Sequence, residues 1–230
     1  MKKQPIFVAV DTNNIKRATQ IVNATNKYIY GVKFGLEFFC SKGGRDAIKK
    51  FQKKNKKIKI FVDLKCKDVP NTVYKAIKSI KDLKVDYLTI HGGGGIQMMM
   101  AAKKAQNETN KKLKLLAVTT LTSLNNKDLK EMGSNSTVEK QVISLAKLAK
   151  KAKIHGIVCS AHEIKKVRKV SRNFEIVVPG IRISNKVQDQ KRVMSLKQAL
   201  KLGANYLVIG RDITKGNPKA NIKKVLNALI

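Results

Sequence analysis

The sequence predicts an α/β fold, specifically a (β/α)8 TIM barrel, from three observations. Short apolar runs alternate with stretches in which apolar residues recur every three or four positions, the pattern of strands and amphipathic helices. There are eight such runs in 230 residues, and strands that alternate with helices pair in parallel through right-handed crossovers. Polar residues and glycines follow the runs, as in barrels whose sites lie at the carboxyl ends of the strands. A doubly wound open sheet, the rival architecture, usually stops at five or six strands.

The apolar runs are the expected strands, and the segments between them are the expected helices. Residues 72–81 and 138–153 carry apolar residues at helical spacing with lysine on the other face, and residues 134–137 predict a loop and a helix N-cap. No linker or low-complexity tract interrupts the alternation, and 43% hydrophobic content suffices for a core, so we expect one barrel domain over residues 1–230. The predicted strands are residues 6–10, 28–32, 58–62, 87–90, 115–118, 156–159, 175–178 and 206–209.

The formal charge of +34 suggests a nucleic-acid or anionic-membrane partner at first sight. Only seven of the 49 basic residues are arginine, the residue that binds phosphates and bases in a bidentate way, and the lysines are spread through every predicted helix. No basic tail, zinc-ligand spacing or RNA-binding aromatic signature accompanies them. We therefore interpret the lysines as solvated helix faces and expect no nucleic-acid partner.

The cysteines and the first residues bear on location. Cys40, Cys66 and Cys159 form neither a CxxC motif nor an even disulfide framework, which indicates reduced thiols in a cytoplasmic protein. The sequence passes from Met-Lys-Lys-Gln-Pro straight into an apolar run that is too short for a signal sequence or a membrane span. We expect a cytoplasmic protein that does not enter a membrane.

The segment from Asp63 to Asp68 places two carboxylates and an ammonium group directly after the third apolar run. On an alternating backbone Asp63 and Lys65 point to the same side. Asp68 lies just beyond, in a turn that ends at Pro70. The three side chains can converge on one small ligand. A surface ion pair at a strand end is the simpler interpretation of this segment alone, so the other strand ends have to decide.

Those other strand ends carry further polar residues, as a barrel site requires. Asp11 and Lys33 follow the first two strands, and two of the seven arginines follow the last two, as Arg182 and Arg211. Barrels most often bind phosphate there, through backbone N–H groups and an added cation. Gln190 can add an amide donor in the loop after the seventh strand. We therefore predict a phosphate site, the alternative being turn glycines beside surface arginines.

Two other groups carry weaker signals. His91 precedes four glycines, but the Lys-Ser/Thr ending of a nucleotide-binding P-loop is missing and no other metal-type ligand is adjacent, so we expect a packed histidine on a flexible turn. Cys159 and His162 suggest a Cys-His pair, yet they lie where a strand runs into the start of a helix. We predict neither a cysteine nucleophile nor a metal site.

Six segments together carry a resemblance to a known family. Residues 32–39 (VKFGLEFF), 63–72 (DLKCKDVPNT), 117–123 (AVTTLTS), 179–182 (PGIR), 189–193 (DQKRV) and 209–214 (IGRDIT) resemble the bacterial type of orotidine 5'-monophosphate decarboxylase. The likeness runs from Ala9 to about Thr214. The Asp-x-Lys-x-x-Asp string alone is shared with sugar-phosphate decarboxylases of the same superfamily. Those relatives resemble a metal-using class that carries an acidic residue at the position where this chain has Lys33.

The resemblance implies decarboxylation of orotidine 5'-monophosphate to uridine 5'-monophosphate in pyrimidine biosynthesis, without a metal or organic cofactor. Lys65, between Asp63 and Asp68, would stabilise the carbanion and deliver a proton, and Lys33 would link Asp63 to the ribose. In the family, Asp68 and Thr72 are supplied by the neighbouring subunit, which implies a homodimer with shared sites. The implied substrate-binding residues are Asp11, Lys33, Thr72, Thr122, Ser123, Pro179, Arg182, Gln190, Gly210 and Arg211.

Two other functions remain open on the sequence. A metal-dependent sugar-phosphate decarboxylase or synthase of the same superfamily would be sensitive to chelators. A basic nucleic-acid-binding protein on a barrel scaffold would show binding that depends steeply on salt. The even spread of lysine and the polar residues at the strand ends argue against the second of these.

Overall fold

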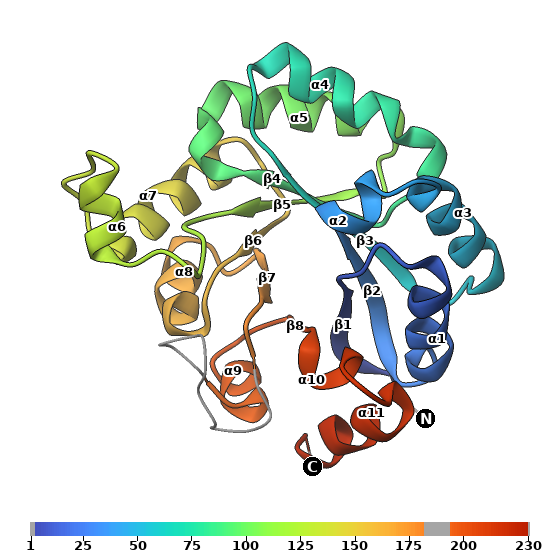
Figure 1. Ribbon diagram of the computed structural model, residues 1–230. Coiled ribbons are helices and arrows are strands. Elements are labelled where there is room, and N and C mark those ends of the chain that lie inside the picture. The colour runs from blue at the N-terminus through green and yellow to red at the C-terminus, as the bar shows by residue number, and fades with distance from the viewer. Residues whose placement is uncertain (1–2, 182–193, 230) are drawn as a thin grey trace.

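Eight parallel strands close into a barrel in chain order in the computed structural model, which describes residues 3–181 and 194–229. The first strand pairs in parallel with both the second and the eighth, which closes the ring (Figure 1). The (β/α)8 barrel predicted from the sequence is therefore confirmed, and the doubly wound alternative is wrong.

The predicted apolar runs overlap all eight strands, but β2 (Ile29–Gly35) and β3 (Lys59–Cys66) continue three and four residues further than predicted. The additional residues in β2 include Lys33, and those in β3 include Asp63 and Lys65. A charged residue ends an apolar run in the sequence but does not end the strand. Lys33, Asp63 and Lys65 therefore belong to the sheet, and the sheet fixes the position of their backbone. The strands are β1 (Gln4–Val10), β2 (Ile29–Gly35), β3 (Lys59–Cys66), β4 (Tyr87–His91), β5 (Lys114–Val118), β6 (Gly156–Val158), β7 (Glu175–Val178) and β8 (Tyr206–Ile209).

Helices follow the strands and cover the outside of the barrel (Figure 1). Thr137 caps α7 by accepting a hydrogen bond from the backbone N–H of Lys140, as the sequence predicted. The main helices are α1 (Ile15–Thr25), α3 (Gly44–Lys54), α4 (Pro70–Ser79), α5 (Gly95–Thr109), α7 (Val138–Lys151), α8 (Ile164–Val170), α9 (Leu196–Lys201) and α11 (Pro218–Asn227). Shorter ones are α2 (Leu36–Cys40), α6 (Asn126–Glu131), α10 (Arg211–Thr214) and the 3-10 turns η1 (Lys81–Leu83), η2 (Gly92–Gly94) and η3 (Ala161–Glu163).

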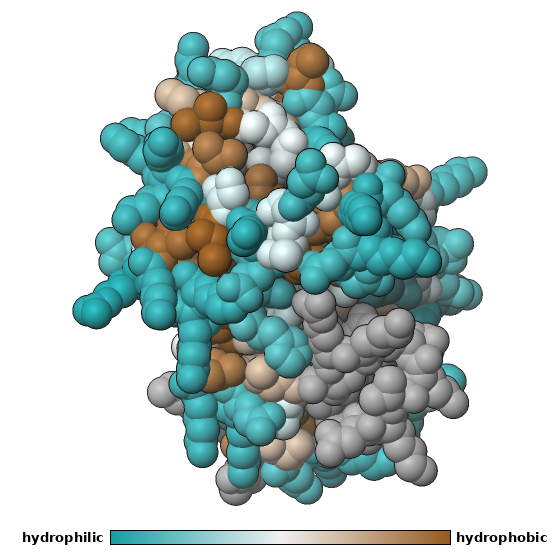
Figure 2. Space-filling model, turned by 90° about the vertical axis from the view of Figure 1, so that its left-hand side faces the viewer, coloured by the Kyte–Doolittle hydropathy of each residue, from teal (hydrophilic) through white to brown (hydrophobic). Residues whose placement is uncertain are grey.

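The long helices turn an apolar stripe towards the strands and their lysines towards solvent. In α7, Val142, Ala146 and Ala149 are buried, and Lys150 and Lys151 occupy the last turn, where a cation interacts favourably with the helix dipole. Figure 2 shows hydrophilic side chains spread over one face of the molecule, with small apolar patches between them. Within the described residues, no helix has the length and apolar character needed to cross a membrane.

Aromatic rings fill the interior of the barrel towards the amino-terminal ends of the strands. Phe7 lies among Tyr30, Phe61, Tyr87 and Tyr206 in edge-on contacts, with ring centroids 5.2 to 5.4 Å apart. Such contacts add to the free energy gained by burying the rings. Branched aliphatic side chains occupy this place in most barrels. The rings close one end of the barrel and leave the carboxyl-terminal end for a cavity.

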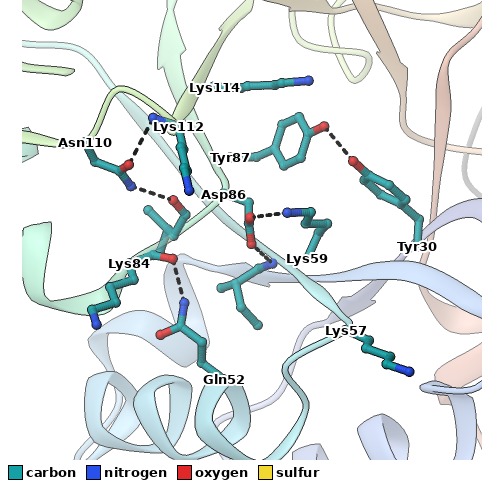
Figure 3. A network of polar contacts seen from close by, with 12 residues as sticks. Tyr30, Gln52, Lys57, Lys59, Lys84, Asp86, Tyr87, Asn110, Lys112 and Lys114 are labelled. Atoms are coloured by element: carbon teal, nitrogen blue, oxygen red, sulfur yellow. Dashed lines mark hydrogen bonds and ion pairs between the residues drawn. The ribbon is translucent and has the colours of Figure 1, made fainter. Parts of the chain in front are cut away.

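A polar network lies at the same end of the barrel, and Figure 3 shows the contact between Tyr30 and Tyr87 that belongs to it. The Tyr87 hydroxyl lies 3.1 Å from the Tyr30 hydroxyl and donates to Glu175 Oε2 at 3.0 Å, and Lys114 pairs with the same carboxylate. Because the single proton of Tyr87 goes to Glu175, Tyr30 is the donor to Tyr87. Burial raises the pKa of Tyr87 and keeps its hydroxyl protonated. The network therefore ties the starts of β2, β4, β5 and β7 together.

Replacing Tyr87 by phenylalanine should lower the free energy of unfolding by about 1–2 kcal/mol, because both hydrogen bonds of its hydroxyl are lost. Tyr28→Phe is the matched control, since the partly buried Tyr28 hydroxyl has no hydrogen-bond partner among the described residues. Urea unfolding should show a change of less than about 0.5 kcal/mol for this control. If both variants lost the same free energy of unfolding, a stabilising role for the network would be contradicted.

Candidate active site

A cavity of about 290 Å³ opens at the carboxyl-terminal ends of the strands. Its floor is apolar and includes Phe61 from the aromatic cluster, together with Ala9 and Val208. An apolar floor keeps water away from the charges above it and strengthens their interactions. Eight of the predicted site residues line the cavity, namely Asp11, Lys33, Asp63, Lys65, Thr122, Pro179, Gly210 and Arg211.

Asp63 is the centre of the charged part of the cavity. Its Oδ2 lies 3.0 Å from Lys65 Nζ and 3.1 Å from Lys33 Nζ, and its Oδ1 accepts a hydrogen bond from the Thr89 hydroxyl at 2.8 Å. Burial alone raises the pKa of this carboxyl, but the two lysines and the hydrogen bonds from Lys65 and Thr89 outweigh burial and hold the pKa below its usual value. Asp63 is therefore a buried anion that stays ionised.

Lys33 connects Asp63 to the rim of the cavity. Its Nζ lies 3.4 Å from Asp11 Oδ1 in addition to its contact with Asp63, and the lysine is 9% exposed. Asp11 is exposed beyond the end of β1, so it can reach a ligand in the cavity. The structure thus brings Asp11, Lys33, Asp63 and Lys65 together as an alternating row of negative and positive groups.

The backbone at Lys65 departs from a regular strand. Between the pairs Val62–Leu88 and Cys66–Ile90, β3 advances four residues while β4 advances two, which makes a bulge. Lys65 itself has a φ of 50°, in the left-handed region that side-chain-bearing residues rarely adopt. Simple alternation was therefore the wrong reason for expecting Asp63 and Lys65 on one side. Their side chains meet because a bulge redirects the strand.

Asp68 and Thr72 do not belong to the cavity of their own chain. Both are exposed and neither lines it, and the Asp68 carboxylate accepts a hydrogen bond from the adjacent backbone N–H of Val69 at 2.7 Å. Asp68 therefore does not meet Asp63 and Lys65 within its own chain, because the chain turns away after Cys66 to begin α4.

Two of the expected substrate-binding residues, Thr122 and Ser123, lie after β5. Thr122 lines the main cavity and also an adjoining one of about 270 Å³, which Ser123 lines as well. Thr120 was among the polar residues after the strands but not among the predicted site residues. It is 7% exposed, lines both cavities and donates to Gln141 Oε1 of α7 at 2.9 Å. Hydroxyl groups on this wall can accept or donate hydrogen bonds to a polar ring.

The expected phosphate-binding residues lie after β7 and β8. Pro179 and Gly210 line the cavity, and Arg211 begins α10 directly after β8. Gly180, beside Pro179, has a φ of 74°, which glycine adopts without strain. The two remaining residues of this prediction, Arg182 and Gln190, lie outside the described residues.

The weaker candidates take no part in the cavity chemistry. His91 Nδ1 accepts a hydrogen bond from the backbone N–H of Gly93 at 3.0 Å, and burial, with the charges of Lys67 and Lys65, lowers its pKa. It does not line the cavity. Cys159 lies in the cavity wall, but burial raises the pKa of its thiol, and His162 is exposed in the following turn. Within residues 3–181 and 194–229, no three His, Cys, Asp or Glu side chains are grouped to hold a metal ion.

A hidden residue, Thr89, bonds to both catalytic candidates of β3. It lies in the middle of β4 with 0% exposure, donates to Asp63, and accepts from the backbone N–H of Lys65 at 2.9 Å. The only signal in the sequence was one hydroxyl residue inside an apolar run. Such a threonine is ordinary in a strand, so nothing singled it out.

Comparison with known proteins agrees with this arrangement. The model of the Orotidine 5'-phosphate decarboxylase / HUMPS family matches residues 4–225. The chain belongs to this family. The resemblance seen in its motifs is therefore confirmed over nearly the whole sequence.

Relatives in this family are similar along their full length. A protein named orotidine 5'-phosphate decarboxylase from Wolbachia pipientis subsp. Culex pipiens is 42% identical over 227 residues, which cover 98% of each chain. One of the same name from Ehrlichia chaffeensis is 43% identical over 231 residues, covering 98% of this chain and 97% of its own. The crystal structure of orotidine 5'-phosphate decarboxylase from Lactobacillus acidophilus superposes with a TM-score of 0.83 at 33% identity, covering 99% of both chains.

Asp63→Asn should lower the free energy of unfolding by about 2–4 kcal/mol, since it leaves Lys33 and Lys65 without their shared counterion in a buried place. Asp82→Asn is the matched control, because Asp82 also binds two cations, Arg45 at 3.1 Å and Lys49 at 2.6 Å, but at 42% exposure. That change should cost less than about 1 kcal/mol.

The effect of Asp63 should also depend on pH in a defined direction. Because the pKa of Asp63 is lowered by folding, its contribution is complete above the unfolded pKa of about 4 and is lost as pH falls through the folded pKa. The difference between wild type and Asp63→Asn in urea unfolding should thus persist at pH 5 and narrow in stronger acid. A difference that vanished at pH 5 would contradict the lowered pKa.

Proposed function

We propose that this protein is an orotidine 5'-phosphate decarboxylase, which converts orotidine 5'-monophosphate to uridine 5'-monophosphate and carbon dioxide, a step of pyrimidine biosynthesis. The observation that carries the proposal is the Asp63 carboxylate shared between two lysine ammonium groups at 3.0 and 3.1 Å in the cavity. Full-length relatives of that name at 42% and 43% identity support it.

Lys65 is the proposed proton donor. When the bond between ring C6 and the carboxylate breaks, the electron pair stays on C6 and carbon dioxide leaves. The Lys65 ammonium group, held by Asp63 over an apolar floor, stabilises this carbanion as it develops and then transfers a proton to C6. The charges are in place before the substrate reacts, so no reorganisation is needed at that moment.

The neighbouring charged residues orient this step. Asp63 lies beside the substrate carboxylate and holds the Lys65 ammonium group towards it, Lys33 links Asp63 to the ribose, and Asp11 binds a ribose hydroxyl at the rim. The distances from Lys33 to Asp11 and Asp63, 3.4 and 3.1 Å, support this row. No metal or organic cofactor is required for these steps.

The base and the phosphate of the substrate would be bound by residues that follow β5, β7 and β8. We assign the base to Thr122 and Ser123, and the phosphate to Gly210 and Arg211 with Pro179 beside them. Arg182 and Gln190 remain predicted phosphate ligands outside the described residues. Binding energy from a phosphate far from the reacting carbon positions the base for the chemical step.

The metal-dependent sugar-phosphate alternative fits the cavity less well. A metal at this place would need the oxygens of Asp63, which already accept from Thr89 and contact two ammonium groups. The metal-using class carries an acidic residue at the position of Lys33. In this chain the Lys33 ammonium group would repel a metal ion there. The nucleic-acid alternative is not favoured either, because the lysines are spread over the helices.

We infer in addition that the protein is a cytoplasmic homodimer in which Asp68 and Thr72 complete the neighbouring site. Their exposure outside their own cavity supports this. Exposed apolar side chains on α2, before α4 and on α5 add support, since Leu36, Val69 and Met100 are 55%, 63% and 50% exposed. The three cysteines are free, in agreement with a reducing compartment.

The reaction is tested by mixing the purified protein with orotidine 5'-monophosphate in excess chelator and following the loss of orotate ultraviolet absorbance. Lys65→Ala should turn over at least about 10³-fold more slowly, because it lacks both the cation and the proton. The variant should still bind uridine 5'-monophosphate in calorimetry. Lys127→Ala, at an 83% exposed lysine, should match the wild type.

Either of two outcomes would contradict these assignments. Substantial turnover by Lys65→Ala would exclude Lys65 as the proton donor. Failure of the wild type, with activity appearing once magnesium and a keto-sugar phosphate are supplied, would establish the superfamily alternative.

The shared site is tested by coexpressing two inactive chains, Lys65→Ala and Asp68→Ala. If Asp68 acts across the interface, a mixed dimer has one intact site, so random pairing should restore about a quarter of wild-type activity. Lys65→Ala with Asp63→Asn is the control, since both residues belong to one cavity and no intact site can form. Mixed dimers without activity in the first pair would overturn the shared site.

A further inference from the structure

The Thr89 hydroxyl joins the two parts of the charged site that the proposed mechanism needs. It donates its proton to Asp63 Oδ1 at 2.8 Å and accepts the backbone N–H of Lys65 at 2.9 Å. The residue is completely buried in β4, so no water competes for either bond. One hydroxyl therefore fixes the acid that lies beside Lys65 and the backbone that carries Lys65.

The bulge explains why a side chain is needed at this place. The β3–β4 ladder is interrupted between Val62–Leu88 and Cys66–Ile90, and a bulge leaves backbone groups of the extra residues without ladder partners. The N–H of Lys65 is one such group, and Thr89 supplies its acceptor. The hydroxyl thus substitutes for a missing backbone hydrogen bond and holds Lys65 at a φ of 50°.

The same hydroxyl orients the carboxylate. With Oδ1 engaged by Thr89, Oδ2 is the oxygen that faces both ammonium groups, Lys65 Nζ at 3.0 Å and Lys33 Nζ at 3.1 Å. Rotation of the carboxylate would break at least one of these contacts. The groups that face Asp63 thus come from β2, β3 and β4, and Asp11, just after β1, adds its charge beyond Lys33.

We propose that Thr89 is a positioning residue of the decarboxylase site, whose hydroxyl sets the Asp63 carboxylate and the bulged Lys65 backbone in the arrangement required for proton delivery. The inference rests on the proposed function. It assigns Thr89 no contact with the substrate, as Thr89 does not line the cavity.

The test compares Thr89→Val, which keeps the shape and removes the hydroxyl, with Thr89→Ser, which restores it. Thr89→Val should lower kcat by about 10²-fold, the effect of a small misplacement of a reacting group. KM and the affinity for uridine 5'-monophosphate should change less than about threefold, because the phosphate and base walls are untouched. Thr89→Ser should recover kcat to within about fivefold of wild type and also serves if Thr89→Val does not fold.

The pH dependence of kcat is a second measurement, and a loss of stability alone would not shift it. Without the hydrogen bond from Thr89, the pKa of Asp63 rises, so the acid limb of the kcat profile should shift to higher pH in Thr89→Val. Thr25→Val is the matched control, since Thr25 is equally buried and its hydroxyl donates only to the backbone carbonyl groups of α1. It should lose stability with unchanged kcat and pH profile.

The outcomes separate this inference from the proposed function. Absence of turnover by the wild type would contradict the proposed function itself. With an active wild type, a Thr89→Val variant whose kcat stays within about twofold, or whose kcat no longer recovers in Thr89→Ser, would overturn the role of Thr89. Equal loss of kcat in Thr25→Val would do the same, since it would reduce the effect to general destabilisation.

Discussion

The contact on which the site depends is the Asp63 carboxylate shared by Lys33 and Lys65. Without the carboxylate between them, the ammonium groups of Lys33 and Lys65 would repel each other. Without the two cations beside it, the buried Asp63 carboxylate would take up a proton. Adjacent parallel strands make the arrangement possible, because the β2–β3 register pairs Lys33 with Phe61 and Gly35 with Asp63. The closed barrel is thus the device that keeps three charges in contact.

One end of the barrel contributes to the stability of the fold, and the other end holds the cavity with its charged groups. Aromatic rings and the Tyr87 network close the amino-terminal end, where Glu175 and Lys114 form an ion pair and line no part of the cavity. The same rings form the floor of the cavity through Phe61, so the packing that stabilises the barrel also lowers the dielectric constant around Asp63. The charges in the cavity therefore interact more strongly than they would at an open surface.

Much of this could be predicted from sequence, because apolar periodicity reports on strands and helices, and parallel strands bring their carboxyl ends together. Asp11, Lys33, Asp63 and Lys65 were found in this way. The bulge at Lys65 was not, since a left-handed residue has no signature unless it is glycine. Thr89 was missed because one hydroxyl in an apolar run looks like ordinary β-structure, and its partners come from another strand.

The site keeps features that each cost stability when taken alone: a lysine at positive φ, a broken ladder and buried charges. They persist because each compensates for another. The bulge brings Lys65 to Asp63, the cations keep Asp63 ionised, and a neighbouring strand supplies the hydroxyl that the broken ladder lacks. The overall positive charge of the chain favours an anion anywhere on the barrel. Only these short-range bonds select one orientation of the Asp63 carboxylate, and orientation is what the proposed proton delivery requires.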